Sequence, residues 1–437
     1  MLEKQMPRMG SHTEQMTRRE LLVSSAAALT GTSATVGPLA LVLGPADALA
    51  QGDDDPIVPF AYHASDEALA DLRRRLEQTR WPERETGAGW DQGPPLEKLK
   101  ELVAYWRTDY DWRRCEAELN RWPQYKTVID DLGIHFIHVR SRHSNALPII
   151  LTHGWPSTIL LFREVIGPLT DPIAHGGTAA DAFDVVIPSL PGFAFSDKPT
   201  ERGWNSERIA RAWGVLMQRL GYRRYVAQGG DWGAFVTTAI AQQRAPGLAA
   251  IHLNFAQTIP DVIPAELQPD QKRAVEIMNT FREKNSGYFQ LQATRPQMIG
   301  YALADSPAGQ AAWIYDIFNS ATGATGRPED ALTPDQMLDE ITLFWLTDSA
   351  ASSARLYLEQ TQLLGKRNNP GRVDLPVGVS VFPHDVWPVA RSWAPQVYPS
   401  LFYWRELDRG GHFASLEVPD LFTEELRRCF GALRNAR

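Results

Sequence analysis

Hydrophobic residues recur at helical spacing through residues 56–130, which follow a short polar linker. The segment 65–79 begins with Ser65, a residue type that caps helices well, and its leucines fall on one helix face. Two further helices are predicted at 96–108 and 112–122. Because no convincing strand precedes or interrupts them, we expect a helical region that comes before any sheet.

Short apolar runs of strand length follow, and stretches with helical periodicity separate them. The runs lie at 134–139, 148–152, 184–187, 225–227, 377–382 and 401–404. This alternation predicts an α/β fold with a mostly parallel sheet that helices cover on both faces.

Between residues 260 and 369 the strand pattern is absent and helical patterns dominate. An all-helical insertion in an α/β domain is typical of a lid over an active site. We therefore expect the sheet domain in two parts, 131–259 and 370–437, with a helical lid at 260–369 between them. A chain of 437 residues is long enough for one such domain with insertions.

The composition is that of an ordinary globular protein, with 43% hydrophobic and 22% charged residues. The formal net charge of -8 gives nucleic acid no general attraction, so no nucleic-acid partner is expected. The two cysteines, Cys115 and Cys429, lack the spacing of a metal or redox motif. Two buried free thiols are expected, although a disulfide between them is left open.

Residues 1–50 resemble a twin-arginine signal peptide. Arg18 and Arg19 precede an apolar stretch of small residues at 23–43, and Ala48-Leu49-Ala50 fits a cleavage site. The alternative is a retained membrane anchor, but glycine, proline, serine and threonine dilute the stretch. We expect export with cleavage at this site, a periplasmic or secreted mature protein, and no stable membrane insertion after cleavage.

A glycine-rich turn at 229–233 joins a predicted strand to a helix predicted at 234–244. Its sequence, Gly-Gly-Asp-Trp-Gly, has the form G-x-nucleophile-x-G, with Asp231 where serine is commoner. The glycines are needed because so sharp a turn leaves no room for side chains beside the nucleophile. Taken alone, the motif fits equally well a turn in which Asp231 caps the helix.

Two downstream residues favour a catalytic role for Asp231. His412 follows the last predicted strand and precedes the C-terminal helix, which is the position of the general base in α/β-hydrolases. Asp385 follows the strand at 377–382, where the acid that orients the base is expected. The order nucleophile, acid, histidine is that of this fold. The neighbouring His384 is the weaker candidate for a catalytic histidine.

The segment His153-Gly154-Trp155-Pro156 comes directly after the strand at 148–152. At this position the α/β-hydrolase fold supplies part of an oxyanion hole. We expect the backbone N–H groups of Trp155 and Trp232 to point at the carboxyl oxygen of Asp231. His153 is expected to be a structural hydrogen-bonding residue, since His412 already fills the role of base.

With these motifs the chain resembles the microsomal-type epoxide hydrolases, which include juvenile hormone epoxide hydrolases and bacterial relatives. The resemblance covers nearly all of the chain after the signal segment, and the number and order of the shared motifs make it specific. The motifs are Pro59-Phe60, Tyr105-Trp106, Tyr110-Asp111-Trp112, Ile134 to His138, the HGWP segment, Ser189 to Phe193, the GGDWG turn, Asp305-Ser306-Pro307, Phe382-Pro383 and Gly410-Gly411-His412-Phe413.

The resemblance implies a catalytic triad of Asp231, Asp385 and His412. The microsomal enzyme has glutamate at the acid position, so Asp385 is a departure, although a chemically mild one. The resemblance also assigns Tyr288 and Tyr357 in the lid, where a neutral phenol can protonate the alkoxide that forms when an epoxide opens. The helical region at the start of the chain would then wrap the core and the lid.

The implied activity is hydrolysis of an epoxide to a vicinal diol through an ester on Asp231, without a metal or an organic cofactor. The expected partners are a small lipophilic epoxide and water, and a homodimer is left open. One alternative is a haloalkane dehalogenase, which also has Asp-Trp in its elbow but has no use for the paired tyrosines. The other is a non-catalytic binding protein on the same fold, against which the complete set of catalytic residues argues.

Overall fold

The computed structural model describes residues 55–323, 326–365, 367, 369–387 and 389–434. The predicted signal segment therefore lies outside the described residues, and its role stays a prediction. Residues Asp53–Arg437 form one compact unit. No helix in the described part of the chain is long and apolar enough to cross a membrane.

A mixed sheet of nine strands lies at the centre of the described residues, in the order β1-β2-β3-β5-β4-β6-β7-β8-β9. The first strands pair antiparallel from β1 to β5, and every pair from β5 onward through β4 to β9 is parallel. The strands are β1 (Val58–Phe60), β2 (Gln124–Ile129), β3 (Leu132–Val139), β4 (Leu147–Thr152), β5 (Phe183–Pro188), β6 (Tyr225–Gly229), β7 (Leu248–Leu253), β8 (Val377–Val381) and β9 (Leu401–Glu406).

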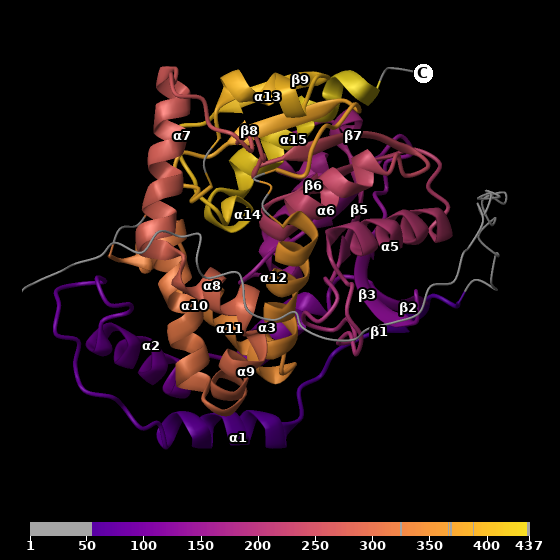
Figure 1. Ribbon diagram of the computed structural model, residues 1–437. Coiled ribbons are helices and arrows are strands. Elements are labelled where there is room, and N and C mark those ends of the chain that lie inside the picture. The colour runs from indigo at the N-terminus through magenta and orange to yellow at the C-terminus, as the bar shows by residue number, and fades with distance from the viewer. Residues whose placement is uncertain (1–54, 324–325, 366, 368, 388, 435–437) are drawn as a thin grey trace, which may run out of the picture. The chain divides into compact units, whose positions relative to one another are not determined.

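Helices surround this sheet and form a second layer of structure beside it (Figure 1). They are α1 (Asp66–Glu77), α2 (Leu96–Thr108), α3 (Trp112–Leu119), α4 (Arg163–Thr170), α5 (Ser206–Arg219), α6 (Asp231–Gln242), α7 (Pro269–Thr280), α8 (Gly287–Thr294), α9 (Pro296–Asp305), α10 (Pro307–Ala321), α11 (Pro334–Leu346), α12 (Ala350–Leu364), α13 (Ala394–Val397), α14 (Ala414–Glu417) and α15 (Pro419–Arg434). The mostly parallel sheet with helices matches the predicted α/β fold.

The three helices predicted before the core are present as α1, α2 and α3. Ser65 caps α1 as expected, because its side chain accepts a hydrogen bond from the N–H of Ala68. The buried residues of α1 are Leu69, Leu72 and Leu76, which lie on the face that the leucine spacing indicates.

The expectation that no strand accompanies these helices was wrong. Strand β1 precedes α1, and β2 pairs with β3 over 124–129. Strand β7 at 248–253 was also not predicted. β1 has only three residues and contains Pro59, and β7 has two alanines among its six residues, so neither carries a strong strand pattern. These segments form strands because they pair with neighbouring strands of the sheet.

The range 260–369, predicted as a helical lid, contains helices α7 to α12. The helices at the start of the chain contact this layer, since α1 and α2 pack on α10, and α3 packs on α11. Figure 1 shows α1 and α2 in indigo beside the orange lid helices.

A buried carboxylate joins the three parts of the fold. Asp339 of α11 is fully buried and accepts hydrogen bonds from Tyr110 at 2.6 Å and Arg114 at 2.8 Å. Arg163, at the start of α4, forms an ion pair with its other oxygen. Because a buried charge must be paired, this cluster fixes the lid against both the core and the early helices.

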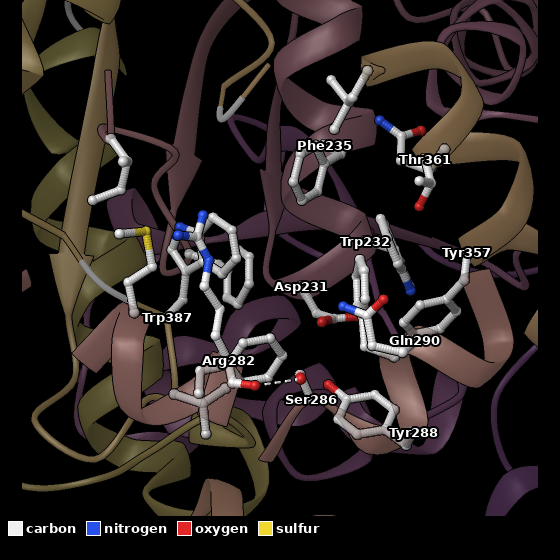
Figure 2. Close-up of a pocket in the computed structure, with 18 of the residues that line it drawn as sticks. Asp231, Trp232, Phe235, Arg282, Ser286, Tyr288, Gln290, Tyr357, Thr361 and Trp387 are labelled. Atoms are coloured by element: carbon white, nitrogen blue, oxygen red, sulfur yellow. Dashed lines mark hydrogen bonds between the residues drawn. The ribbon is translucent and has the colours of Figure 1, made fainter. Parts of the chain in front are cut away.

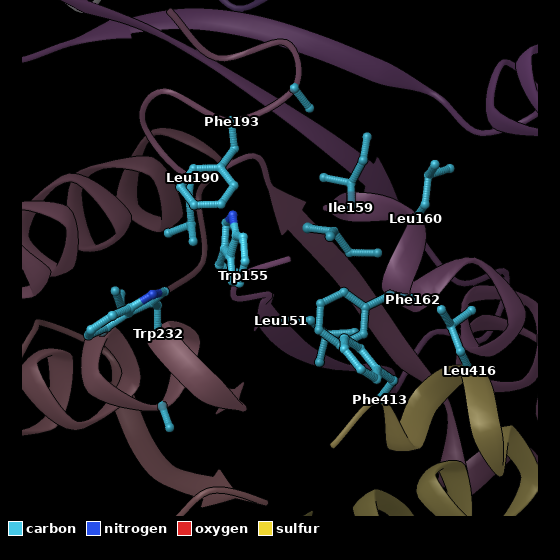
Figure 3. Close-up of a cluster of buried hydrophobic side chains, with 14 of the residues drawn as sticks. Leu151, Trp155, Ile159, Leu160, Phe162, Leu190, Phe193, Trp232, Phe413 and Leu416 are labelled. Carbon is cyan, nitrogen blue, oxygen red and sulfur yellow. The ribbon is translucent and has the colours of Figure 1, made fainter. Parts of the chain in front are cut away.

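The hydrophobic core continues up to the ends of the strands that carry the catalytic motifs. Figure 3 shows Trp155 between Trp232 and the segment that carries Leu190 and Phe193. Trp155 and Trp232 are 3% and 6% exposed, so both flanks of the candidate nucleophile belong to this packed core.

Candidate active site

The central turn of the site joins β6 to α6 and carries Asp231. Helix α6 begins at Asp231 itself, three residues before its predicted start. Asp231 has a φ of 48°, in the left-handed region that residues other than glycine rarely adopt. A Cβ on Gly233 would lie 1.9 Å from the carbonyl oxygen of Thr152. The turn therefore has the strain and the close approach of a nucleophile elbow.

A backbone N–H group holds one oxygen of this carboxylate. The N–H of Trp155 donates to Oδ1 of Asp231 at 2.8 Å, and the first turn of α6 adds its positive electrostatic potential. The N–H of Trp232, the other predicted donor, makes no hydrogen bond to Asp231 within the described residues. Its part in an oxyanion hole stays a prediction.

His412 lies beside Asp231 and contacts both the predicted nucleophile and the predicted acid. Its Nδ1 is 2.9 Å from Oδ1 of Asp385, and its Nε2 is 3.5 Å from Oδ2 of Asp231. The hydrogen bond to Asp385 directs Nε2 toward Asp231. The structure thus brings together the three residues that the sequence predicted as a triad.

The charges around His412 set its protonation. Burial alone would lower the pKa of His412, but interactions with the carboxylates of Asp385 and Asp231 raise it to about 10. The imidazole is therefore protonated at neutral pH in the free protein.

Both predicted lid tyrosines face the same carboxylate. Tyr288 of α8 and Tyr357 of α12 line one pocket with Asp231, and their ring centroids are 6.0 Å apart. Figure 2 shows both phenol rings pointing from the lid toward the carboxylate of Asp231. Burial is the main cause that raises the pKa of each phenol above its usual value. Both phenols are therefore neutral at physiological pH.

The pocket above Asp231 is a mainly apolar cavity of about 230 Å³. Its apolar wall comprises Phe235, Phe255, Ile259, Met278, Phe281, Phe289, Leu364, Val386 and Trp387. A mainly apolar lining with a few polar groups is typical of a site for a small molecule. In the described part of the chain, no group of three or more His, Cys, Asp or Glu side chains is arranged to hold a metal ion.

Two other histidines near these motifs have different surroundings. His153 is fully buried, and burial lowers its pKa to about 4. Its Nδ1 lies 3.0 Å from the carbonyl oxygen of Gly154, and its Nε2 accepts the N–H of Leu190. It therefore holds two loops together, as expected. His384 is exposed, and its backbone bridges to Gly411.

Sequence patterns did not indicate two residues that support the triad. The ring of Trp387 stacks on Phe255 with ring centroids 4.7 Å apart, and its backbone N–H donates to Oδ1 of Asp385 at 3.2 Å. Glu417 accepts the N–H of Phe413, next to His412, at 2.9 Å. Trp387 follows Asp385 by two positions, and this closeness in sequence is the one feature that could have indicated its contact with the acid.

Comparison with known proteins gives two family matches. Residues 57–162 match the epoxide hydrolase N terminus, and residues 148–292 match the alpha/beta hydrolase fold. A protein of Stigmatella aurantiaca, provisionally assigned as an epoxide hydrolase, is 59% identical over 379 residues and covers 86% of each chain.

Two further relatives agree with these matches. Epoxide hydrolase 1 of Sus scrofa is 34% identical, with 89% of this chain and 92% of that protein covered. The crystal structure of juvenile hormone epoxide hydrolase from the silkworm Bombyx mori has a TM-score of 0.79 at 28% identity, and covers 88% of this chain and 96% of that one.

The fold and the strained aspartate elbow thus define an α/β-hydrolase with an additional N-terminal region. The chain belongs to the microsomal-type epoxide hydrolase family, and it is an epoxide hydrolase. The predicted fold class and the predicted enzyme class are both confirmed.

Proposed function

We propose that this epoxide hydrolase acts on small lipophilic epoxides in two covalent steps, with Asp231 as the nucleophile. The observation that carries the proposal is the position of Asp231 between two sets of groups. His412 lies on one side with Asp385 behind it, and the phenols of Tyr288 and Tyr357 lie on the other. Nucleophile, base and acids therefore converge on one carboxylate.

In the first step, Oδ2 of Asp231 attacks a carbon of the epoxide, because Oδ1 is already held by the N–H of Trp155. The new carbon–oxygen bond forms an alkyl ester, and the strained ring bond breaks. A phenol of Tyr288 or Tyr357 gives its proton to the departing oxygen, which becomes the first hydroxyl of the diol.

The first step also changes the state of the base. Esterification removes the negative charge of Asp231, which helps to raise the pKa of His412 in the free protein. With this charge gone, burial opposes only the charge of Asp385, so the pKa of His412 falls and its proton can neutralise the phenolate left in the lid. The protein thus generates a neutral imidazole when a base is required.

In the second step, His412 takes a proton from water while the water oxygen adds to the carboxyl carbon of Asp231. Asp385 holds the imidazole and stabilises its positive charge. The tetrahedral oxyanion forms on Oδ1, where Trp155 donates its N–H. Collapse breaks the bond between the carboxyl carbon and the alkyl oxygen, and His412 returns the proton to the released diol.

The apolar wall of the pocket supports the lipophilic class of substrate. Most of the side chains around the 230 Å³ cavity are aromatic or aliphatic, so a compact hydrocarbon epoxide is favoured over a polar one.

We further propose that the protein is exported by the twin-arginine route. This proposal rests on Arg18 and Arg19 and the apolar stretch after them.

Turnover of styrene oxide to its diol tests the proposed function. The wild-type protein should form the diol, whereas Asp231→Ala should not, although it should keep its fold. Absence of diol from styrene oxide and from a panel of bulkier lipophilic epoxides would contradict the proposal. Release of halide from a chloroalkane at a higher rate than epoxide opening would favour a dehalogenase instead.

A further inference from the structure

A second, much smaller cavity lies behind Asp231. Its volume is about 10 Å³, which is roughly the space that one water molecule needs. Asp231, His412, Gln228 and Asn254 are among its lining residues. Asp231 is the one residue that lines both this cavity and the apolar pocket described above. The carboxylate therefore separates the apolar pocket from a small cavity that contains several polar side chains.

Gln228 has an unused hydrogen-bond acceptor at this cavity. It is the fourth residue of strand β6 and only 1% exposed. Its Nε2 donates to Oδ1 of Asn254 at 2.8 Å, which fixes the orientation of the amide. Its Oε1 is buried and has no donor among the described residues. A buried amide oxygen without a partner is costly, and bound water is the usual remedy.

The other polar side chains of the cavity wall are already occupied. The hydroxyl of Ser157 donates to the carbonyl of Gly154, and that of Ser415 donates to the carbonyl of Leu161. Asn254 lies against the turn, because a Cβ on Gly230 would come within 2.8 Å of its amide. Gln228 is thus the free acceptor nearest in sequence to Asp231. It lies near the end of strand β6, which leads into the turn that carries Asp231.

We propose that this cavity holds the hydrolytic water and that Gln228 is the residue that positions it, with Asn254 fixing the Gln228 amide. The proposal rests on the two-step function above and adds a binding site for its second substrate. A water there donates one hydrogen to Oε1 of Gln228 and the other to Nε2 of His412. Its lone pair then points at the carboxyl carbon of the Asp231 ester.

Hydrolysis of the ester at this site transfers one proton from water to His412. The water oxygen forms a bond to the carboxyl carbon, and the proton on its His412 side moves to Nε2. The hydrogen bonded to Gln228 stays on the oxygen, so the amide neither gains nor loses a proton. A site on the far side of Asp231 keeps this water in place when a lipophilic ester fills the apolar pocket.

Single-turnover kinetics on Gln228→Met test the proposal. This change keeps the volume of the side chain but removes the acceptor. Formation of the ester should remain within twofold of wild type, and its decay should slow by roughly 10- to 100-fold, as expected for loss of one hydrogen bond in the transition state. The ester should therefore accumulate at steady state. Gln310→Met is the matched control, because Gln310 is also buried and donates one hydrogen bond, to Ile341, outside both cavities.

A second variant keeps the test decisive if Gln228→Met does not fold. In Gln228→Glu a neutral carboxyl keeps both the donor for Asn254 and the acceptor for water. Once ionised it loses the donor and repels the anionic intermediate. The rate constant of ester decay in this variant, divided by that of wild type at the same pH, should therefore be near one at low pH and fall as the pH rises.

Two results would overturn the role of Gln228. Ester decay at the wild-type rate in Gln228→Met is one, and equal slowing of formation and decay is the other, because the latter indicates a general disturbance of the elbow. Failure to detect any ester on Asp231, even in a variant without the base, would contradict the two-step function itself. The two failures are therefore distinguishable.

Discussion

Nε2 of His412 lies 3.5 Å from Oδ2 of Asp231, which is beyond a strong hydrogen bond but near enough for their charges to interact. This relationship means that the base and the nucleophile control one another. Ionised Asp231 helps to keep His412 protonated, and esterification of Asp231 removes that contribution to the pKa.

The contribution of His412 to stability should depend on pH. Its pKa is about 10 in the folded protein and about 6.5 in an unfolded chain. Because the folded value is the higher one, the stabilisation is complete below pH 6.5 and is lost as the pH rises toward 10. Denaturant unfolding across this range should show wild-type stability falling, and His412→Gln should lack this component. Parallel curves for the two proteins would contradict the raised pKa.

The acid partner should account for much of this shift. Asp385→Asn removes the charge that raises the pKa of His412 most, so the pKa should fall below about 10, although the charge of Asp231 still raises it. Titration of the imidazole resonances by NMR measures the change directly. Ester hydrolysis should also slow, because the amide no longer stabilises the imidazolium. An unchanged imidazole pKa would remove Asp385 from its role.

The lid tyrosines should act on ring opening alone. Tyr288→Phe and Tyr357→Phe should each slow ester formation by roughly 10²-fold, at the low end of what a general acid contributes, and the double variant should nearly abolish it. Rapid-mixing measurements of ester formation provide the test. Tyr301→Phe is a suitable control, since Tyr301 is a lid tyrosine that is 73% exposed. Normal ester formation in the double variant would exclude the phenols from the mechanism.

The buried cluster at Asp339 should determine how firmly the lid is held. Asp339→Ala leaves Arg163 and Arg114 without their shared partner, and breaking such a buried pair costs about 3–5 kcal/mol of unfolding free energy. Chemical denaturation measures this loss. Asp330→Ala is the control, because Asp330 is exposed and pairs with the exposed Arg327. A loss below about 1 kcal/mol in Asp339→Ala would mean that the cluster does not anchor the lid.

The parts of the fold that were predictable are those in which local pattern and burial agree. Ser65 and its leucines mark α1, and the glycines around Asp231 mark a turn that only small residues allow. The edge strand at 58–60 and the alanine-containing strand at 248–253 depend on pairing with neighbours, and no local pattern encodes that.

The same limit applies to the site. Chain order indicated Asp231, Asp385 and His412, because the fold repeats this order. Gln228 was not indicated, since an amide in a buried strand has no motif. The sequence indicated only that a polar residue stands near the end of an apolar strand. That its Oε1 is free becomes evident only from the hydrogen bond to Asn254 and the neighbouring cavity.

Replacement of Arg18 and Arg19 by lysine tests the proposed export route. The precursor of that variant should stay in the cytosol, whereas the wild-type protein should appear beyond the membrane. Cell fractionation with antibody detection measures both. Normal amounts of the mature protein outside the membrane in the variant would contradict a twin-arginine signal.

The central claim is that Asp231 forms a covalent ester with the substrate. A single turnover in ¹⁸O-water, with protein in excess over epoxide, tests it most directly. The diol should carry no label, because its new oxygen comes from Asp231, and the peptide that contains Asp231 should gain ¹⁸O. Label in the first-turnover diol and none in the protein would show that water attacks the epoxide directly, and would contradict Asp231 as the nucleophile.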